Sequence, residues 1–187
     1  AQTLPISLDV GTDNEELLQD DLYIGWRHPR LRGEAYDAVV DELVRAVKQR
    51  FPKALLQWED FKQWNAVRLL ERYRHELPSF NDDIQGTAAV AVAGVTVAAR
   101  AARRPLRDER VVIVGAGAAG VGIARLLRTT LAREGLAGEA LRGAIALVDA
   151  QGLIAGDDDE NRRDLAWTAE LAAARGVRPG SPLLEVV

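Results

Sequence analysis

A short apolar strand, a glycine-rich turn and a helix follow one another from residue 111, and this order of elements constrains the fold most. Residues 111–114 are all Val or Ile, and Gly115, Gly117 and Gly120 follow them in a Gly-x-Gly-x-x-Gly pattern. A helix predicted at 118–133 leads through further glycines to a second apolar strand at 144–148. Strand, helix and strand in this order indicate a parallel pair with a crossover helix, the unit of a doubly wound α/β sheet.

The glycine pattern lies where a dinucleotide-binding turn requires it, after a strand and at the start of a helix. Gly115 would permit the tight turn, Gly117 the close approach of backbone to a pyrophosphate, and Gly120 the packing of helix on strand. The helix N-terminus, with Ala118 and Ala119 in its first turn, would face the phosphates. We therefore predict a dinucleotide site at this turn.

Asp149 ends the second apolar strand, where a carboxylate would accept hydrogen bonds from the adenosine ribose hydroxyls. Its separation from the glycines exceeds the usual interval of about 20 residues, and an ordinary turn-forming Asp is the alternative interpretation. A carboxylate here would repel a 2'-phosphate, and the following stretch, with acidic residues at 157–160, offers no cation until Arg162. We expect NAD as cofactor in preference to NADP.

Composition excludes several classes of ligand. The chain of 187 residues has a net charge of -4 and a pI near 5.3, which argues against nucleic acid as a partner. It contains no Cys, so oxygen atoms or the two His must hold any metal, and Mg²⁺ or Mn²⁺ fits best. No apolar stretch reaches about 18 residues without a charge, so we expect no membrane span. Small metabolites are the expected ligands.

Glu59 and Asp60 form an acidic pair directly after a short apolar strand predicted at 54–58. Strand ends of an α/β sheet open onto a cleft, so this pair is a candidate metal site. Successive strand residues point to opposite faces, so the chain must turn between the two residues if both are to contact one ion. A solvated strand end is the alternative interpretation.

A second acidic pair, Asp82 and Asp83, follows Asn81 and precedes a helix of small residues predicted at 84–102. Carboxylates are stabilised at a helix N-terminus by unpaired backbone N–H groups. Helix capping is therefore the simplest interpretation. Capping needs only one carboxylate, however, and a metal site stays open as the alternative.

The rest of the chain predicts a strand at 4–9 and amphipathic helices at 34–50 and 66–73. His28 lies in a short basic loop, which favours a surface loop or a subunit contact over catalysis. The composition changes near residue 82, so we predict two domain parts, 1–82 and 83–187. The chain has no Met, and we expect the natural start to lie upstream.

Several stretches, taken in order, resemble the malic enzymes: LDVGTDNE at 8–15, YIG at 23–25, QWEDF at 57–61, FNDDIQGT at 80–87, GAGAAG at 115–120, and VD with GLI between 148 and 154. The run at 81–87 is the most specific. Two positions depart from the family pattern, Ala118 where Glu is common and Trp58 where Phe is more usual. The resemblance fades beyond Asp157.

The resemblance implies that Glu59, Asp60 and Asp83 hold the divalent metal and that Asp82 supports a general-base Lys. The implied reaction is the oxidative decarboxylation of L-malate to pyruvate and CO₂ with reduction of NAD. The implied fold is the end of the family's N-terminal domain followed by the first half of its Rossmann-type NAD-binding domain. The base Lys and an acid Tyr would lie upstream and the substrate-binding Asn side chains downstream, so this piece alone should be inactive.

The resemblance also leads us to expect a cytoplasmic homo-oligomer, dimeric or tetrameric. Two other functions stay open from the residues. One is a non-catalytic dinucleotide-binding module, and the other is a metal-dependent 2-hydroxy acid dehydrogenase that does not decarboxylate.

Overall fold

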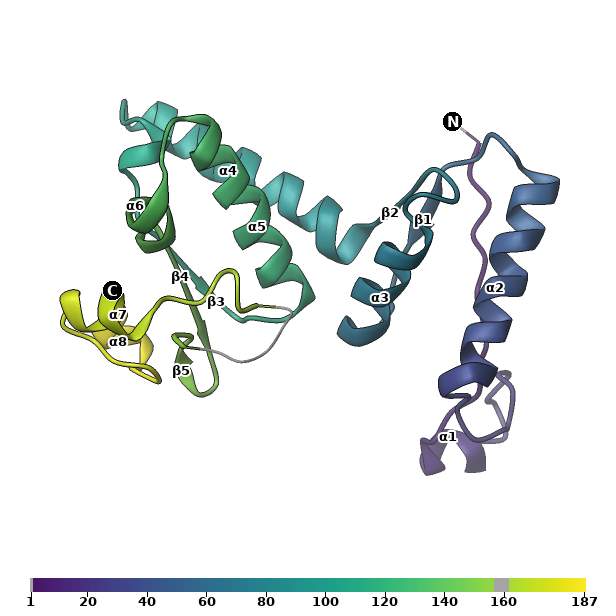
Figure 1. The fold of residues 1–187 in the computed structure, drawn as a ribbon. Helices are drawn as coiled ribbons and strands as arrows, with labels where there is room; N and C mark the ends of the chain where they lie inside the picture. The colour runs from purple at the N-terminus through teal and green to yellow at the C-terminus, as the bar shows by residue number, and fades with distance from the viewer. Residues whose placement is uncertain (1, 157–161) are drawn as a thin grey trace. The chain divides into compact units, whose positions relative to one another are not determined.

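A computed structural model describes residues 2–156 and 162–187 of the chain (Figure 1). The chain divides into two compact units, Ala1–Ala54 and Leu55–Val187.

The first unit begins with an extended segment and contains the helices α1 (Glu15–Gln19) and α2 (Gly33–Arg50). The strand predicted at 4–9 is wrong, because this segment forms no ladder with any described residue. Leu4 and Ile6 are 64% and 51% exposed, so their alternation does not mark a buried face. A strand is stable only when a neighbour pairs with its backbone, and sequence alternation alone does not supply one.

The helix predicted at 34–50 is confirmed by α2. Its buried residues recur at intervals of three or four along one face: Tyr36, Val40, Val44 and Val47. This spacing is the apolar stripe of an amphipathic helix.

The second unit opens with a parallel strand pair, β1 (Leu56–Trp58) and β2 (Ser79–Asn81), joined by helix α3 (Gln63–Tyr73). Trp58 pairs with Asn81 in the register, so both strands end at the same edge of this small sheet. The Trp58 ring is 2% exposed and stacks on Tyr73 at 5.7 Å between ring centroids. This aromatic contact packs α3 against the strands.

A π-helical turn, η1 (Asp82–Gly86), follows β2 and continues into helix α4 (Thr87–Ala101). The predicted helix at 84–102 is thus confirmed, but its first turn is wider than an α-helix. By length and composition the combined segment Asp82–Ala101 could cross a membrane, because a window of 18 residues within it has a mean hydropathy of 1.3. One face of α4 nevertheless packs on helix α5 (Ala118–Arg133), as in a helix of a folded domain (Figure 1).

A second sheet has the order β3 (Val111–Val114), β4 (Ile145–Asp149) and β5 (Gly152–Leu153). β3 and β4 are parallel and joined through α5, which confirms the predicted α/β unit. β5 turns back antiparallel to β4 through Gly152, whose φ is +99°. The main core lies between this sheet, α4 and α5, and includes the fully buried Leu127, Leu131 and Leu147.

Shorter elements complete this unit: η2 (Leu106–Asp108), α6 (Gly138–Gly143), α7 (Ala169–Ala174) and α8 (Leu183–Val186). Trp167 closes the far side of the sheet, because its indole Nε1 donates a hydrogen bond of 2.6 Å to the Ile145 carbonyl oxygen. Trp167 also forms a parallel bridge with Ala155. The segment before α7 is therefore held against the β4 and β5 strands.

Candidate functional site

The turn between β3 and α5 has the backbone geometry of a diphosphate cradle. Gly115 has φ +108°, a conformation that L side chains rarely adopt, and its N–H donates to the Val148 carbonyl oxygen at 2.7 Å. A Cβ at Gly120 would overlap the Gly115 carbonyl oxygen, so only glycine lets α5 approach the turn this closely. Gly115 and Gly120 thus have the roles that the glycine pattern predicts.

The N-terminus of α5 is open to a ligand. Gly117 is its N-cap residue and has no side chain to cap the helix, so no side chain caps the first-turn N–H groups of Ala118 and Ala119. Unpaired N–H groups and the positive end of the helix dipole favour an anion. This turn therefore fits the pyrophosphate of a dinucleotide.

Helix α5, which follows the glycine turn, packs directly on η1, the turn that carries the second acidic pair. At Gly122 of α5 a Cβ would lie 2.5 Å from the Ile84 carbonyl oxygen of η1, so glycine is required for this contact. The sequence interpretation did not include Gly122. The available sequence signal was a further glycine within the predicted helix at 118–133.

The two acidic pairs follow the paired ends of β1 and β2, and we call Glu59, Asp60, Asp82 and Asp83 the acidic edge. Asp60 has φ +59°, which is uncommon outside glycine. The chain therefore turns between Glu59 and Asp60, as a shared ligand would require. Glu59 Oε2 accepts a hydrogen bond of 3.0 Å from the Gln57 side chain, and both acidic residues of this pair are exposed.

Asn81, and not an aspartate, caps the turn η1. Its Oδ1 accepts a hydrogen bond of 3.0 Å from the Ile84 N–H, and its own N–H donates to Gln85 Oε1 at 3.0 Å. Asn81 is fully buried, so this reciprocal cap is shielded from water. The capping function is thus supplied without Asp82 or Asp83.

The side chains of the acidic edge do not converge on one point. Within residues 2–156 and 162–187, no three His, Asp or Glu side chains are grouped closely enough to hold a metal ion. The donor chemistry suits a hard cation, since all four groups are carboxylates. The assignment of Glu59, Asp60 and Asp83 as metal ligands, and of Asp82 as a catalytic residue, stays a prediction.

Asp149 lies at the C-terminal end of β4, next to the glycine turn. Its Oδ1 accepts a hydrogen bond of 2.8 Å from the Gln151 N–H, and its Oδ2 lies 2.9 Å from the Arg162 guanidinium. In the sequence Arg162 is the first cation after Asp149, and the fold brings this arginine back onto the Asp149 carboxylate. The acidic residues 157–160 lie outside the described part of the chain.

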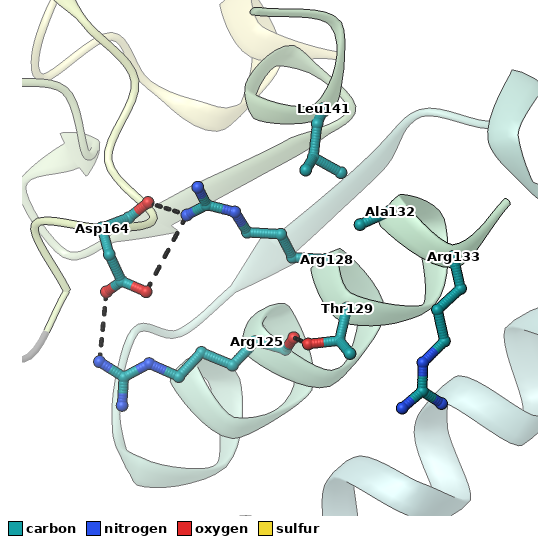
Figure 2. A pocket seen from close by; sticks show the side chains of 7 residues that line it. All are labelled: Arg125, Arg128, Thr129, Ala132, Arg133, Leu141 and Asp164. Carbon is teal, nitrogen blue, oxygen red and sulfur yellow. Dashed lines mark hydrogen bonds and ion pairs between the residues drawn. The ribbon is translucent and has the colours of Figure 1, made fainter. Parts of the chain in front are cut away.

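Two other features contribute little to a site. The His28 ring is exposed and stacks on Trp26 at 4.2 Å between centroids, in keeping with a surface loop. A surface hollow beside α5 is lined by three arginines, but two of them, Arg125 and Arg128, are paired with Asp164 (Figure 2).

The fold and the glycine turn define a dinucleotide-binding α/β protein, and comparisons with known proteins narrow this class. Residues 1–74 match the family model "Malic enzyme, N-terminal domain", and residues 84–187 match "Malic enzyme, NAD binding domain". The chain belongs to the malic enzyme family.

Curated relatives include the "NAD-dependent malic enzyme" of Photorhabdus laumondii and that of Sodalis glossinidius. Each is 54% identical over 154 residues, which is 82% of this chain and 27% of the relative. The chain thus spans about a quarter of the length of these relatives.

Solved structures show the same fold. The malic enzyme of Entamoeba histolytica superposes with a TM-score of 0.61 at 23% identity, over 80% of this chain and 32% of that one. The malic enzyme of Pyrococcus horikoshii gives a TM-score of 0.56 at 25% identity, over 82% and 36%.

Proposed function

We propose that the protein containing this chain converts L-malate to pyruvate and CO₂ and reduces NAD. Membership of the malic enzyme family supports this reaction, as do relatives named NAD-dependent malic enzyme. The observation that carries the proposal is the contact between Gly122 and Ile84, which places the turn bearing Asp82 and Asp83 directly on the dinucleotide helix. A hydride transfer requires that substrate groups and cofactor share one cleft.

In this proposal Glu59, Asp60 and Asp83 hold Mg²⁺ or Mn²⁺. When bound, the ion would supply Lewis-acid stabilisation of negative charge on the substrate oxygens. Asp82 holds the ammonium group of a basic Lys from another part of the protein and keeps it oriented toward the substrate hydroxyl. These assignments follow the family resemblance and the shared sheet edge.

The glycine turn and Asp149 bind the cofactor. The backbone N–H groups of Ala118 and Ala119 donate to the pyrophosphate, because no side chain caps them. Gly115 and Gly120 keep the turn free of side chains that would block this approach. Asp149 accepts hydrogen bonds from the adenosine ribose.

Metal binding tests the acidic edge. Mn²⁺ titrated into the complete protein can be followed by electron paramagnetic resonance of the free ion. We expect Asp83→Ala to abolish binding at concentrations that saturate the unmodified protein, because one of three carboxylate ligands is lost. Asp108→Ala is the matched control, since Asp108 lies in η2 and is 59% exposed. Equal Mn²⁺ affinity in Asp83→Ala and Asp108→Ala would contradict the metal site and favour the non-catalytic module.

Product analysis tests the reaction. We expect the complete protein to release one CO₂ for each NADH formed from L-malate. NADH formation without CO₂ would instead identify a 2-hydroxy acid dehydrogenase.

We also propose that the complete protein is a homo-oligomer, a dimer or tetramer. The support is a loop of the first unit that exposes Leu22 and Ile24, at 85% and 102%, beside the half-exposed Trp26. Light scattering should show a single species in unmodified protein and dissociation in Ile24→Lys. An unmodified protein that is monomeric would contradict the proposal.

A further inference from the structure

The ion pair between Asp149 and Arg162 occupies the place where a Rossmann-type site selects its cofactor. Asp149 ends β4 beside the glycine turn, where a carboxylate would accept the ribose hydroxyls. The Arg162 nitrogen Nη1 lies 2.9 Å from its Oδ2, and both side chains are 25% exposed. Together with the Gln151 N–H on Oδ1, each carboxylate oxygen of Asp149 already accepts a hydrogen bond.

Contacts with α5 and with the main core hold the segment that carries Arg162. Two residues further on, Asp164 pairs with Arg125 of α5 at 3.2 Å and also contacts Arg128, as Figure 2 shows. The next residues, Leu165 and Ala166, are buried in the main core. Arg162 is therefore held at the end of β4 by the packing of its own segment.

We propose that Arg162 is a specificity-determining residue that lets this site accept a 2'-phosphorylated adenosine as well as the free ribose. A free carboxylate accepts the ribose 2'-hydroxyl and repels a 2'-phosphate, whereas a guanidinium attracts the phosphate. Arg162 neutralises Asp149, so the pair no longer repels a 2'-phosphate, and the guanidinium is the group that the phosphate would contact. This inference rests on the proposed cofactor site.

Two adenosine fragments isolate this effect from catalysis. Calorimetry on the complete protein, in phosphate-free buffer, should compare adenosine 5'-monophosphate with adenosine 2',5'-bisphosphate. We expect Arg162→Gln to bind the monophosphate more tightly and the bisphosphate more weakly. The ratio of the two dissociation constants should change by about tenfold or more, as expected for one charge-assisted hydrogen bond. Arg178→Gln, an exposed arginine in the same unit, is the matched control and should leave the ratio unchanged.

Asp149→Asn provides a second test of opposite sign. It should weaken the monophosphate and preserve or strengthen binding of the bisphosphate. The inference is overturned if Arg162→Gln binds both fragments with an unchanged ratio, or if Asp149→Asn weakens both equally. If the unmodified protein binds neither fragment, the proposed cofactor site itself is wrong, and the inference fails with it.

Discussion

The dinucleotide turn and the acidic edge are built in different ways. The turn is made by consecutive residues, and its geometry follows from glycine backbone angles and from the absence of a side chain at Gly120. The acidic edge consists of two pairs that lie more than twenty positions apart in the sequence. They follow the ends of β1 and β2, and these two strands are paired. The turn is therefore complete within the chain, whereas the carboxylates of the acidic edge do not converge within the described residues. Backbone sites are specified locally, and side-chain sites require long-range packing.

The largest effect is expected at the centre of the dinucleotide turn. In Gly120→Val the new side chain would overlap the Gly115 carbonyl oxygen, which is backbone and cannot move alone. We expect loss of detectable NAD binding and a decrease of about 3 kcal/mol in the free energy of unfolding, from overpacking. Urea denaturation and NAD titration of the complete protein measure both quantities.

Gly94→Ala is the control for this substitution. Gly94 lies in α4, where a Cβ would meet no atom within 4 Å. Alanine should raise the free energy of unfolding by about 0.5 to 1 kcal/mol, because it restricts the unfolded chain. A Gly120→Val protein as stable as the unmodified one would show that the turn is not locally specified.

The sequence pattern predicted the elements around the glycine turn in detail. The strand at 111–114 and the helix at 118–133 match β3 and α5, because a contiguous apolar strand and a glycine turn depend on local conformation. The strand at 4–9 was wrong, since alternation says nothing about a pairing partner. β2 was missed because three residues, Ser79–Asn81, are too few to show periodicity.

The candidate site was less accessible to sequence reasoning. The Asn81 cap was missed because the adjacent aspartates are equally good capping residues. The approach of Arg162 to Asp149 depends on the reversal at β5 and on the packing of Leu165 and Ala166, which no local pattern reports.

A second substitution acts on the acidic edge through the cap of η1, the turn that carries Asp82 and Asp83. Asn81→Ala removes the Oδ1 acceptor that caps η1, and we expect a loss of about 1 kcal/mol in the free energy of unfolding. The turn bearing Asp82 and Asp83 should also become less ordered, so Mn²⁺ affinity should fall while binding of adenosine 5'-monophosphate is retained.

Asn81→Ser tests the cause of that loss. Ser has a side-chain acceptor suited to the N-cap, so it should recover stability and Mn²⁺ affinity in part. If Asn81→Ala weakened the nucleotide and the metal equally, the two regions would not be separable.

The smallest effect is expected at a carboxylate of the first unit, which sharpens the contrast with the acidic edge. Asp9 accepts hydrogen bonds from the Trp26 N–H at 2.6 Å and the Gly11 N–H at 2.9 Å, and these lower the pKa of its carboxyl below the ordinary value. A carboxyl with a lowered pKa in the folded state stabilises the fold above the unfolded-state pKa, and this contribution is lost as the pH falls through the folded-state pKa.

Asp9→Asn should therefore unfold at lower urea concentration than the unmodified protein at pH 7, and the difference should shrink at pH 3. Asp21→Asn, an exposed charge in the same unit, controls for the change in net charge. A difference between Asp9→Asn and the unmodified protein that stays the same at both pH values would mean that Asp9 acts by its shape and not by its charge. In that case the charge of Asp9 would not be used by its backbone hydrogen bonds, and the proposed contrast between Asp9 and the acidic edge would fail.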